Sequence, residues 1–189
     1  MRKLTVILLA YLLLLSAACS VTDRDAETFD RFREELCAAE ALEFTAEIIA
    51  DYGGYTQSYR LKCSGSNGET RVEIVLPEVI SGIAANVRDG GTELEFDGAI
   101  LEVGTLDDSG LSPVSALPAL LRSMRQGHVE SLGRSVGDDI LTAQITISDS
   151  SEQMLWLDSE TLRPIRAEIS TGGRVVIYCD FVDFELESD

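Results

Sequence analysis

Apolar and polar residues alternate with a period of two along most of the chain, which is the pattern of strands with one buried face. Between residues 42 and 52, for example, Leu42, Phe44 and Ile48 alternate with acidic or polar residues. The turn signals Asn67-Gly68 and Asp97-Gly98 separate neighbouring runs. Together these patterns predict strands near 42–52, 55–63, 72–76, 83–87, 94–96, 99–103, 129–136, 139–148, 152–158, 164–170 and 174–186.

Two segments have helical spacing instead. Residues 25–40 predict a helix whose apolar face contains Phe29, Phe32, Leu36 and Cys37. Residues 113–126 predict a second helix, which Ser112 can cap, Pro113 can begin and Gly127 ends. The apolar face of this second helix consists of Leu117, Leu120, Leu121 and Met124.

So many strands do not remain a flat sheet with one bare apolar face, because large sheets twist and curl or close. The expected fold is therefore mainly β (α+β): a curved antiparallel sheet, or incomplete β-barrel, with the two helices covering its concave side. We expect one such domain at 28–189, with no internal repeat and no linker to a second domain.

The N-terminus has the layout of a secretory signal peptide. Arg2 and Lys3 precede an uncharged apolar run, Leu4–Leu15, of about 12 residues, which is shorter than the roughly 20 that span a bilayer. Small residues then lead to Cys19, as in a bacterial lipobox. We therefore predict a lipoprotein signal peptide at 1–18 and a lipid anchor and tether at 19–27, with Cys19 as the attachment site.

Ser16 departs from the lipobox pattern, which prefers leucine three positions before the cysteine. Ordinary signal-peptide cleavage, with Cys19 unmodified, is therefore the alternative.

The chain is strongly acidic. It has 15 basic and 33 acidic residues and a net charge of −18; removing Arg2 and Lys3 with the signal leaves 13 basic residues and a charge of −20. Nucleic acid and anionic head groups would repel such a protein. The composition excludes a nucleic-acid partner and makes the lipid the expected membrane attachment, on the extracytoplasmic face of the cell membrane.

Three cysteines remain once Cys19 is lipidated. Cys37, Cys63 and Cys179 each share the helical face or strand parity of apolar neighbours, which places all three on the apolar side. They are either buried free thiols or include one disulfide, and the pair is left open. Their spacing matches no zinc pattern, so no metal site is expected.

Nothing in the sequence marks a catalytic centre. His128, the single histidine, follows the end of a predicted helix, where histidines commonly interact with carbonyls. The pairs Asp107-Asp108 and Asp138-Asp139 lack the spacing of a calcium loop and suit turns. We expect no enzyme activity, no catalytic residue and no cofactor.

Several stretches resemble the LolA and LolB lipoprotein carriers, and more closely the related Gram-positive lipoproteins of the clostridial spore-germination GerS type. These stretches are Tyr59–Lys62 leading into Thr70–Ile74, Leu155–Asp158 followed by Leu162–Ile165, and Val182–Glu185. The order of elements also agrees over most of residues 25–187.

The resemblance implies a half-barrel that binds a lipid or lipoprotein acyl chain without catalysis. Alternatively, it implies a module that binds an envelope protein and chaperones or activates a cell-wall hydrolase. Trp156 lies in a run that is apolar at both parities, which indicates either core packing or a face left for a ligand. The expected cavity residues are Phe29, Phe32, Leu36, Phe44, Leu61, Leu117, Leu121 and Trp156.

Overall fold

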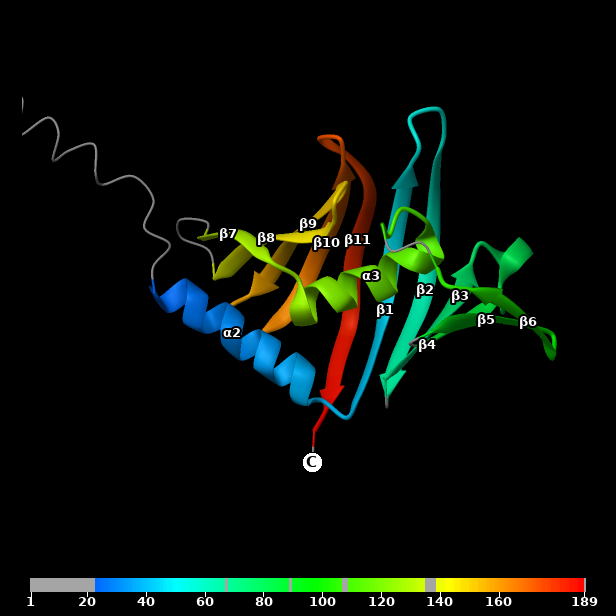
Figure 1. The fold of residues 1–189 in the computed structure, drawn as a ribbon, viewed down its shortest axis with the longest axis horizontal. Helices are drawn as coiled ribbons and strands as arrows, with labels where there is room; N and C mark the ends of the chain where they lie inside the picture. Colours follow the sequence, from blue (N-terminus) through cyan, green and yellow to red (C-terminus); the bar gives the residue numbers. More distant parts are fainter. Residues whose placement is uncertain (1–22, 67, 89, 107–108, 135–138, 189) are drawn as a thin grey trace, which may run out of the picture.

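The computed structural model describes residues 23–66, 68–88, 90–106, 109–134 and 139–188. The predicted signal peptide and Cys19 lie outside these residues. In the described part, the chain forms two α-helices, eleven strands and a short 3₁₀ turn (Figure 1). Along the chain these are α2 (Asp23–Ala38), β1 (Ala41–Asp51), β2 (Thr56–Ser66), β3 (Glu69–Leu76), η2 (Glu78–Ile80), β4 (Ala84–Arg88), β5 (Gly91–Phe96), β6 (Ala99–Gly104), α3 (Pro113–Gln126), β7 (Val129–Arg134), β8 (Ile140–Ser148), β9 (Ser151–Asp158), β10 (Arg163–Thr171) and β11 (Arg174–Glu187).

All eleven strands belong to one antiparallel sheet with the order β6-β5-β4-β3-β2-β1-β11-β10-β9-β8-β7. The first six strands run outward from the centre to one edge, and α3 carries the chain to the opposite edge. The last five strands return, so that β11 pairs with β1 and Cys179 lies opposite Ile48. Because β6 and β7 are opposite edges, the sheet stays open. The predicted curved, incomplete barrel is confirmed.

The alternating pattern of β1 corresponds directly to burial. Leu42, Phe44, Ala46, Ile48 and Ala50 are all 3% exposed or less, while the residues between them face the other side of the sheet. Burial of one face of a central strand removes large apolar side chains from water, each contributing about 1.5–3 kcal/mol. The period-two pattern therefore predicts both the strand and its orientation.

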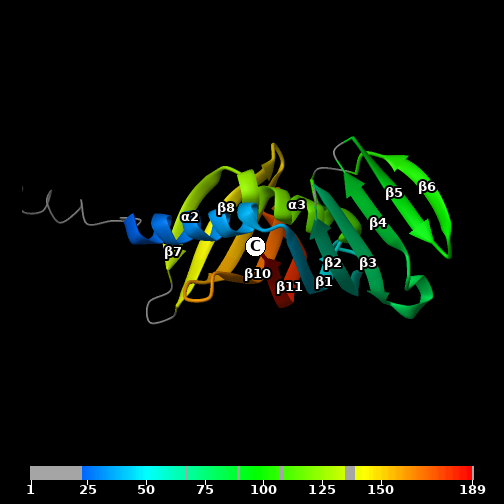
Figure 2. The ribbon, with the colours of Figure 1, turned by 90° about the horizontal axis from the view of Figure 1, so that it is seen from below.

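Both helices lie on the same side of the sheet, the concave side (Figures 1 and 2). α2 buries Phe29, Phe32 and Leu36 against the sheet. It begins at Asp23, so residues 23–27 of the predicted tether are helical. α2 lies beside β7, and α3 crosses the middle of the sheet and contacts β8 and β3.

α3 begins at the predicted cap. The Ser112 hydroxyl accepts a hydrogen bond from the Ser115 amide, and the Ser115 hydroxyl accepts one from the Ser112 amide, both at 3.2 Å. Gly127 ends the helix, but with φ −65°, so a left-handed conformation is not the reason for glycine. A Cβ at this position would lie 2.5 Å from Ile145 Cγ2. The same Cβ would lie 2.6 Å from the Ser123 carbonyl oxygen, so both β8 and the last turn of α3 leave room only for glycine here.

Candidate binding surface of the half-barrel

The concave side under the helices is filled by side chains. Seven of the predicted cavity residues lie in one packed cluster, each 2% exposed or less: Phe29, Phe32, Leu36, Phe44, Leu61, Leu117 and Leu121. Helices and sheet thus meet directly at these positions, as in a close-packed protein interior.

Trp156 does not join this cluster. Its neighbours Leu155 and Leu157 are buried on the concave side, whereas Trp156 is half-buried and pairs with Thr142 and Arg166 on the opposite face. Both parities of this run are apolar, so the sequence pattern leaves its orientation undecided. The register of β9 between β8 and β10 decides it.

Polar contacts fix the helices in place. Arg33 of α2 donates to the carbonyl oxygens of Met124 at 3.0 Å and Gly127 at 2.9 Å, and its guanidinium lies 5.0 Å from the Phe29 ring centre. The Ser123 hydroxyl of α3 donates to the buried side-chain oxygen of Gln153 on β9. Sequence reasoning missed Arg33, because its partners are backbone carbonyls about 90 residues away.

Burial declines along one row of concave side chains from the centre to the β6 edge. Cys63, Val72 and Ala85, which are paired across β2, β3 and β4, are 0–1% exposed. Leu94 on β5 continues the row and is half-buried, and Leu101 on β6 is 62% exposed. Both views place β6 beyond the end of α3 (Figures 1 and 2). Thr92 at the start of β5 is buried and lines a pocket with Ser115 and Ala119, so α3 covers the start of β5, while all of β6 is exposed.

We call the strands β4 to β6 the open wing, because burial falls from β4, where Ala84 and Ala85 are buried, to β6, which is exposed throughout. Phe96, at the end of β5, is 53% exposed, and every residue of β6 is exposed. Ile100 is 67% exposed and Val103 is 39% exposed. Sequence reasoning predicted these strands but did not single out the residues. The available signal was the segment 99–104 (AILEVG), which has Ala99, Leu101 and Val103 at one parity and Ile100 at the other.

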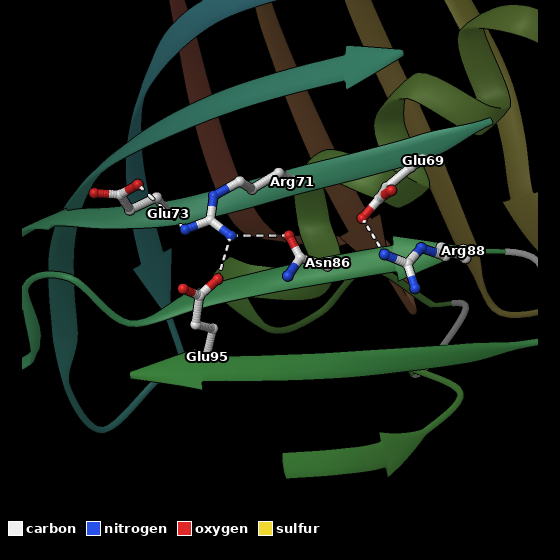
Figure 3. A network of polar contacts seen from close by, with 6 residues as sticks. All are labelled: Glu69, Arg71, Glu73, Asn86, Arg88 and Glu95. Carbon is white, nitrogen blue, oxygen red and sulfur yellow. Dashed lines mark hydrogen bonds and ion pairs between the residues drawn. The ribbon is translucent and has the colours of Figure 1, made fainter. Parts of the chain in front are cut away.

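Charged side chains connect the strands of the open wing on its convex face (Figure 3). Arg71 on β3 donates to Asn86 on β4 at 3.0 Å and to Glu95 on β5 at 2.7 Å. Its hydrogen bond and positive charge lower the pKa of the Glu95 carboxyl. These contacts hold β3, β4 and β5 together on the convex face.

Arg88, at the end of β4, extends this network of charged contacts on the convex face. Its guanidinium lies 2.9 Å from Glu69 and 3.6 Å from Glu93. The hydrogen bond with Glu69 and the charges of both carboxylates raise the pKa of Arg88. Glu102, the next acidic residue outward, lies directly opposite Glu93. Among the described residues, the side chain of Glu102 has no hydrogen-bond or ion-pair partner.

The cysteines differ in their placement. Cys63 and Cys179 are buried free thiols, and burial raises the pKa of both. Cys37 is an exposed free thiol, so its predicted burial is wrong. It is the residue after Leu36, which rotates it about 100° away from the buried face of α2.

A disulfide between Cys63 and Cys179 conflicts with the topology. They lie on β2 and β11, with β1 between them. Two strand spacings separate their Cα atoms by at least about 9 Å, and a disulfide needs less than about 7 Å.

The other positions considered in the sequence are His128 and the aspartate pairs. His128 is exposed, and its Nε2 lies 4.0 Å from a carboxylate oxygen of Glu130. Asp107, Asp108 and Asp138 lie outside the described residues. Within the described ranges, no group of three acidic, histidine or cysteine side chains can hold a metal ion. Likewise, neither α2 nor α3 is long and apolar enough to cross a membrane.

No protein-family model and no curated protein sequence matches the chain. Its fold resembles that of an uncharacterized conserved protein from Thermus thermophilus, with a TM-score of 0.54, 12% identity and coverage of 87% of this chain and 88% of that one. It also resembles a LolA superfamily protein from Nitrosomonas europaea, with a TM-score of 0.50, 13% identity and coverage of 90% and 96%.

The complex of the CwlD amidase with the GerS lipoprotein from Clostridioides difficile matches with a TM-score of 0.47, 14% identity and coverage of 89% and 98%. At this level, particular closeness to the GerS type is not established. The chain therefore has a LolA-like fold, and these similarities concern the fold alone.

Proposed function

We propose that this chain is a lipid-anchored protein on the extracytoplasmic face of the cell membrane, and that its half-barrel binds an apolar ligand without catalysis. The ligand would be a lipid or the acyl chain of a lipoprotein. The observation that carries this proposal is the open wing, where the concave apolar row continues from buried Ala85 to exposed Leu101.

An acyl chain suits this surface chemically. Each methylene group removed from water contributes about 0.8 kcal/mol. Leu94, Phe96 and Leu101 offer apolar surface next to a core that is already packed. The contacts of Arg33 fix the helices, so the ligand would lie on the open wing and not beneath α2 and α3.

The proposed anchor would hold the domain close to a membrane by its β7 edge, where Asp25 of α2 contacts Arg134, while the open wing lies at the opposite edge (Figure 1). Lipidation would occur at Cys19, and α2 begins at Asp23, so only residues 20–22 would separate the lipid from the first helix. The acidic surface of the domain would be repelled by anionic head groups, which leaves the acyl chains as the attachment.

Titration of the processed chain with an environment-sensitive fluorescent fatty acid tests ligand binding. We expect saturable binding that Phe96→Ser weakens by about tenfold, because a buried phenylalanine contributes about 1.5–3 kcal/mol. Ile165→Ser, which removes a 41%-exposed apolar side chain from β10, is the matched control and should leave affinity unchanged. Equal losses in both variants, or no saturable binding, would contradict the proposal.

The second candidate function is protein interaction, in which the domain chaperones or activates an envelope protein such as a cell-wall hydrolase. The exposed edge strand β6 favours it, because unpaired edges with apolar side chains are templates for pairing with another chain. Capture of proteins from envelope extracts on the immobilised processed chain tests this function. Recovery of no envelope protein would contradict it.

A further inference from the structure

The two edges of the sheet differ in protection. Native edge strands are commonly protected by charged side chains, proline or a covering element. At one edge, β7 contains Glu130 and Arg134, and Arg134 forms an ion pair with Asp25 of α2 at 2.8 Å. At the other edge, β6 contains one charged residue, Glu102, and no proline. All six residues of β6 are exposed.

The register of β6 places an apolar side chain on its concave face and an acidic side chain on its convex face. Leu101 pairs with Leu94 and continues the concave apolar row. Glu102 points to the convex side, where it pairs with Glu93, and like charges directly opposite each other are destabilising. Glu93 is 3.6 Å from Arg88, which Glu69 contacts more closely. Within the described residues, a cation next to Glu102 is therefore missing.

The convex face indicates where that cation would come from. Arg71 on β3 contacts Glu95 on β5 across β4 (Figure 3), and Arg88 on β4 also contacts Glu93 on β5. In this arrangement, a basic side chain on one strand meets a carboxylate on a strand nearby. For Glu102, the described part of the chain supplies no strand on the outer side of β6.

We propose that an extended segment of a partner protein adds to the free edge of β6. It would place a lysine or arginine beside Glu102 and apolar side chains beside Leu101. The proposal rests on the second candidate function, protein interaction, and specifies its site and the chemistry of the partner. A second copy of this chain is a poor occupant, because β6 has no basic residue and each copy has a charge of −18.

The probe is a short labelled peptide in which valine alternates with lysine, titrated into the processed chain and followed by fluorescence anisotropy. We expect saturable binding and slower hydrogen exchange of the β6 amides. Glu102→Lys should weaken binding by about fivefold or more, because it replaces an attractive pair by a repulsive one. It should also gain affinity for a matched peptide in which valine alternates with glutamate.

Glu130→Lys is the matched control, because it makes the same change of charge on the opposite edge strand, β7. It should leave the affinity of the lysine peptide within about twofold. If both variants weakened peptide binding equally, the peptide would be attracted by the overall charge of the chain and not by Glu102, and the proposal would be overturned. Absence of saturable binding up to about 1 mM, or protection confined to other strands, would overturn it as well. The proposal would also be overturned if the chain self-associated and Glu102→Lys abolished that self-association.

Capture of proteins from envelope extracts on the immobilised processed chain distinguishes failure of the β6 assignment from failure of the protein-interaction function on which it rests. We expect Glu102→Lys to recover less of the captured protein than the wild type or Glu130→Lys. Equal recovery by all three would leave protein interaction standing and overturn the assignment to β6. Recovery of nothing by the wild type would overturn protein interaction itself.

Discussion

At the residue scale, the buried thiols show how position within an element determines chemistry. Cys63 and Cys179 are both fully buried, and desolvation of the thiolate is the main cause of their raised pKa. Cys37 belongs to the same residue type but is exposed at the end of α2, where its Sγ lies 3.9 Å from the Arg125 carbonyl oxygen. We infer that Cys37 is the reactive thiol of the described residues.

The raised thiol pKa values predict a loss of stability in alkali. Above the ordinary value of 9.0 the unfolded thiols ionise while the folded ones stay protonated. The free energy of unfolding should therefore fall as pH rises above about 9, by at most about 1.4 kcal/mol per pH unit for each thiol. Urea unfolding between about pH 8 and about pH 10.5 measures the slope.

The Cys63→Ala/Cys179→Ala variant is the control for this slope. Its lysine and tyrosine residues still titrate in this range. Its free energy of unfolding should therefore fall with pH less steeply than that of the wild type. Equal slopes would contradict the assignment to the thiols.

At the element scale, α3 contains both a feature that the sequence predicts and one that it does not. Ser112 and Pro113 mark the start of the helix, because a cap depends on local residues only. The need for glycine at position 127 comes partly from Ser123 of the same helix and partly from Ile145, which belongs to β8 and lies 18 positions further along the chain. No local pattern contains that contact.

Loss of the cap should destabilise the fold modestly. Ser112→Ala removes the hydroxyl that accepts from the Ser115 amide, which costs about 1 kcal/mol in comparable helices. We expect a lower urea concentration at the unfolding midpoint and an unchanged dependence of the unfolding free energy on urea. Ser112→Asp retains an acceptor and should remain close to the wild type. A midpoint for Ser112→Ala equal to that of the wild type would show that Ser112 does not stabilise α3.

At the scale of the whole molecule, charge and attachment are connected. The predicted mature chain has a charge of −20, which anionic head groups would repel. The proposed lipid on Cys19 is then the attachment that the sequence favours. The same acidity favours basic partners over a second copy at β6.

Replacement of Cys19 tests the attachment directly. Cys19→Ala should release the chain from membranes, or leave it uncleaved with its signal peptide, because no thiol remains at that position to acylate. Membrane fractionation with mass measurement of the N-terminus distinguishes the two results. Cys37→Ala, which removes an exposed thiol within the domain, is the control and should remain membrane-bound. Mature Cys19→Ala protein in the membrane fraction at the wild-type level would contradict lipid anchoring.

The sequence by itself predicted the strands, both helices, their buried faces apart from Cys37, and the open curved sheet, because local periodicity and turn residues record which side of each element is buried. Only the tertiary structure decided how far the helices reach across the sheet. It packed seven predicted cavity residues into the core, turned Trp156 to the other face and left β6 uncovered with Glu102 opposite Glu93. These outcomes depend on contacts between distant segments, which local periodicity does not encode.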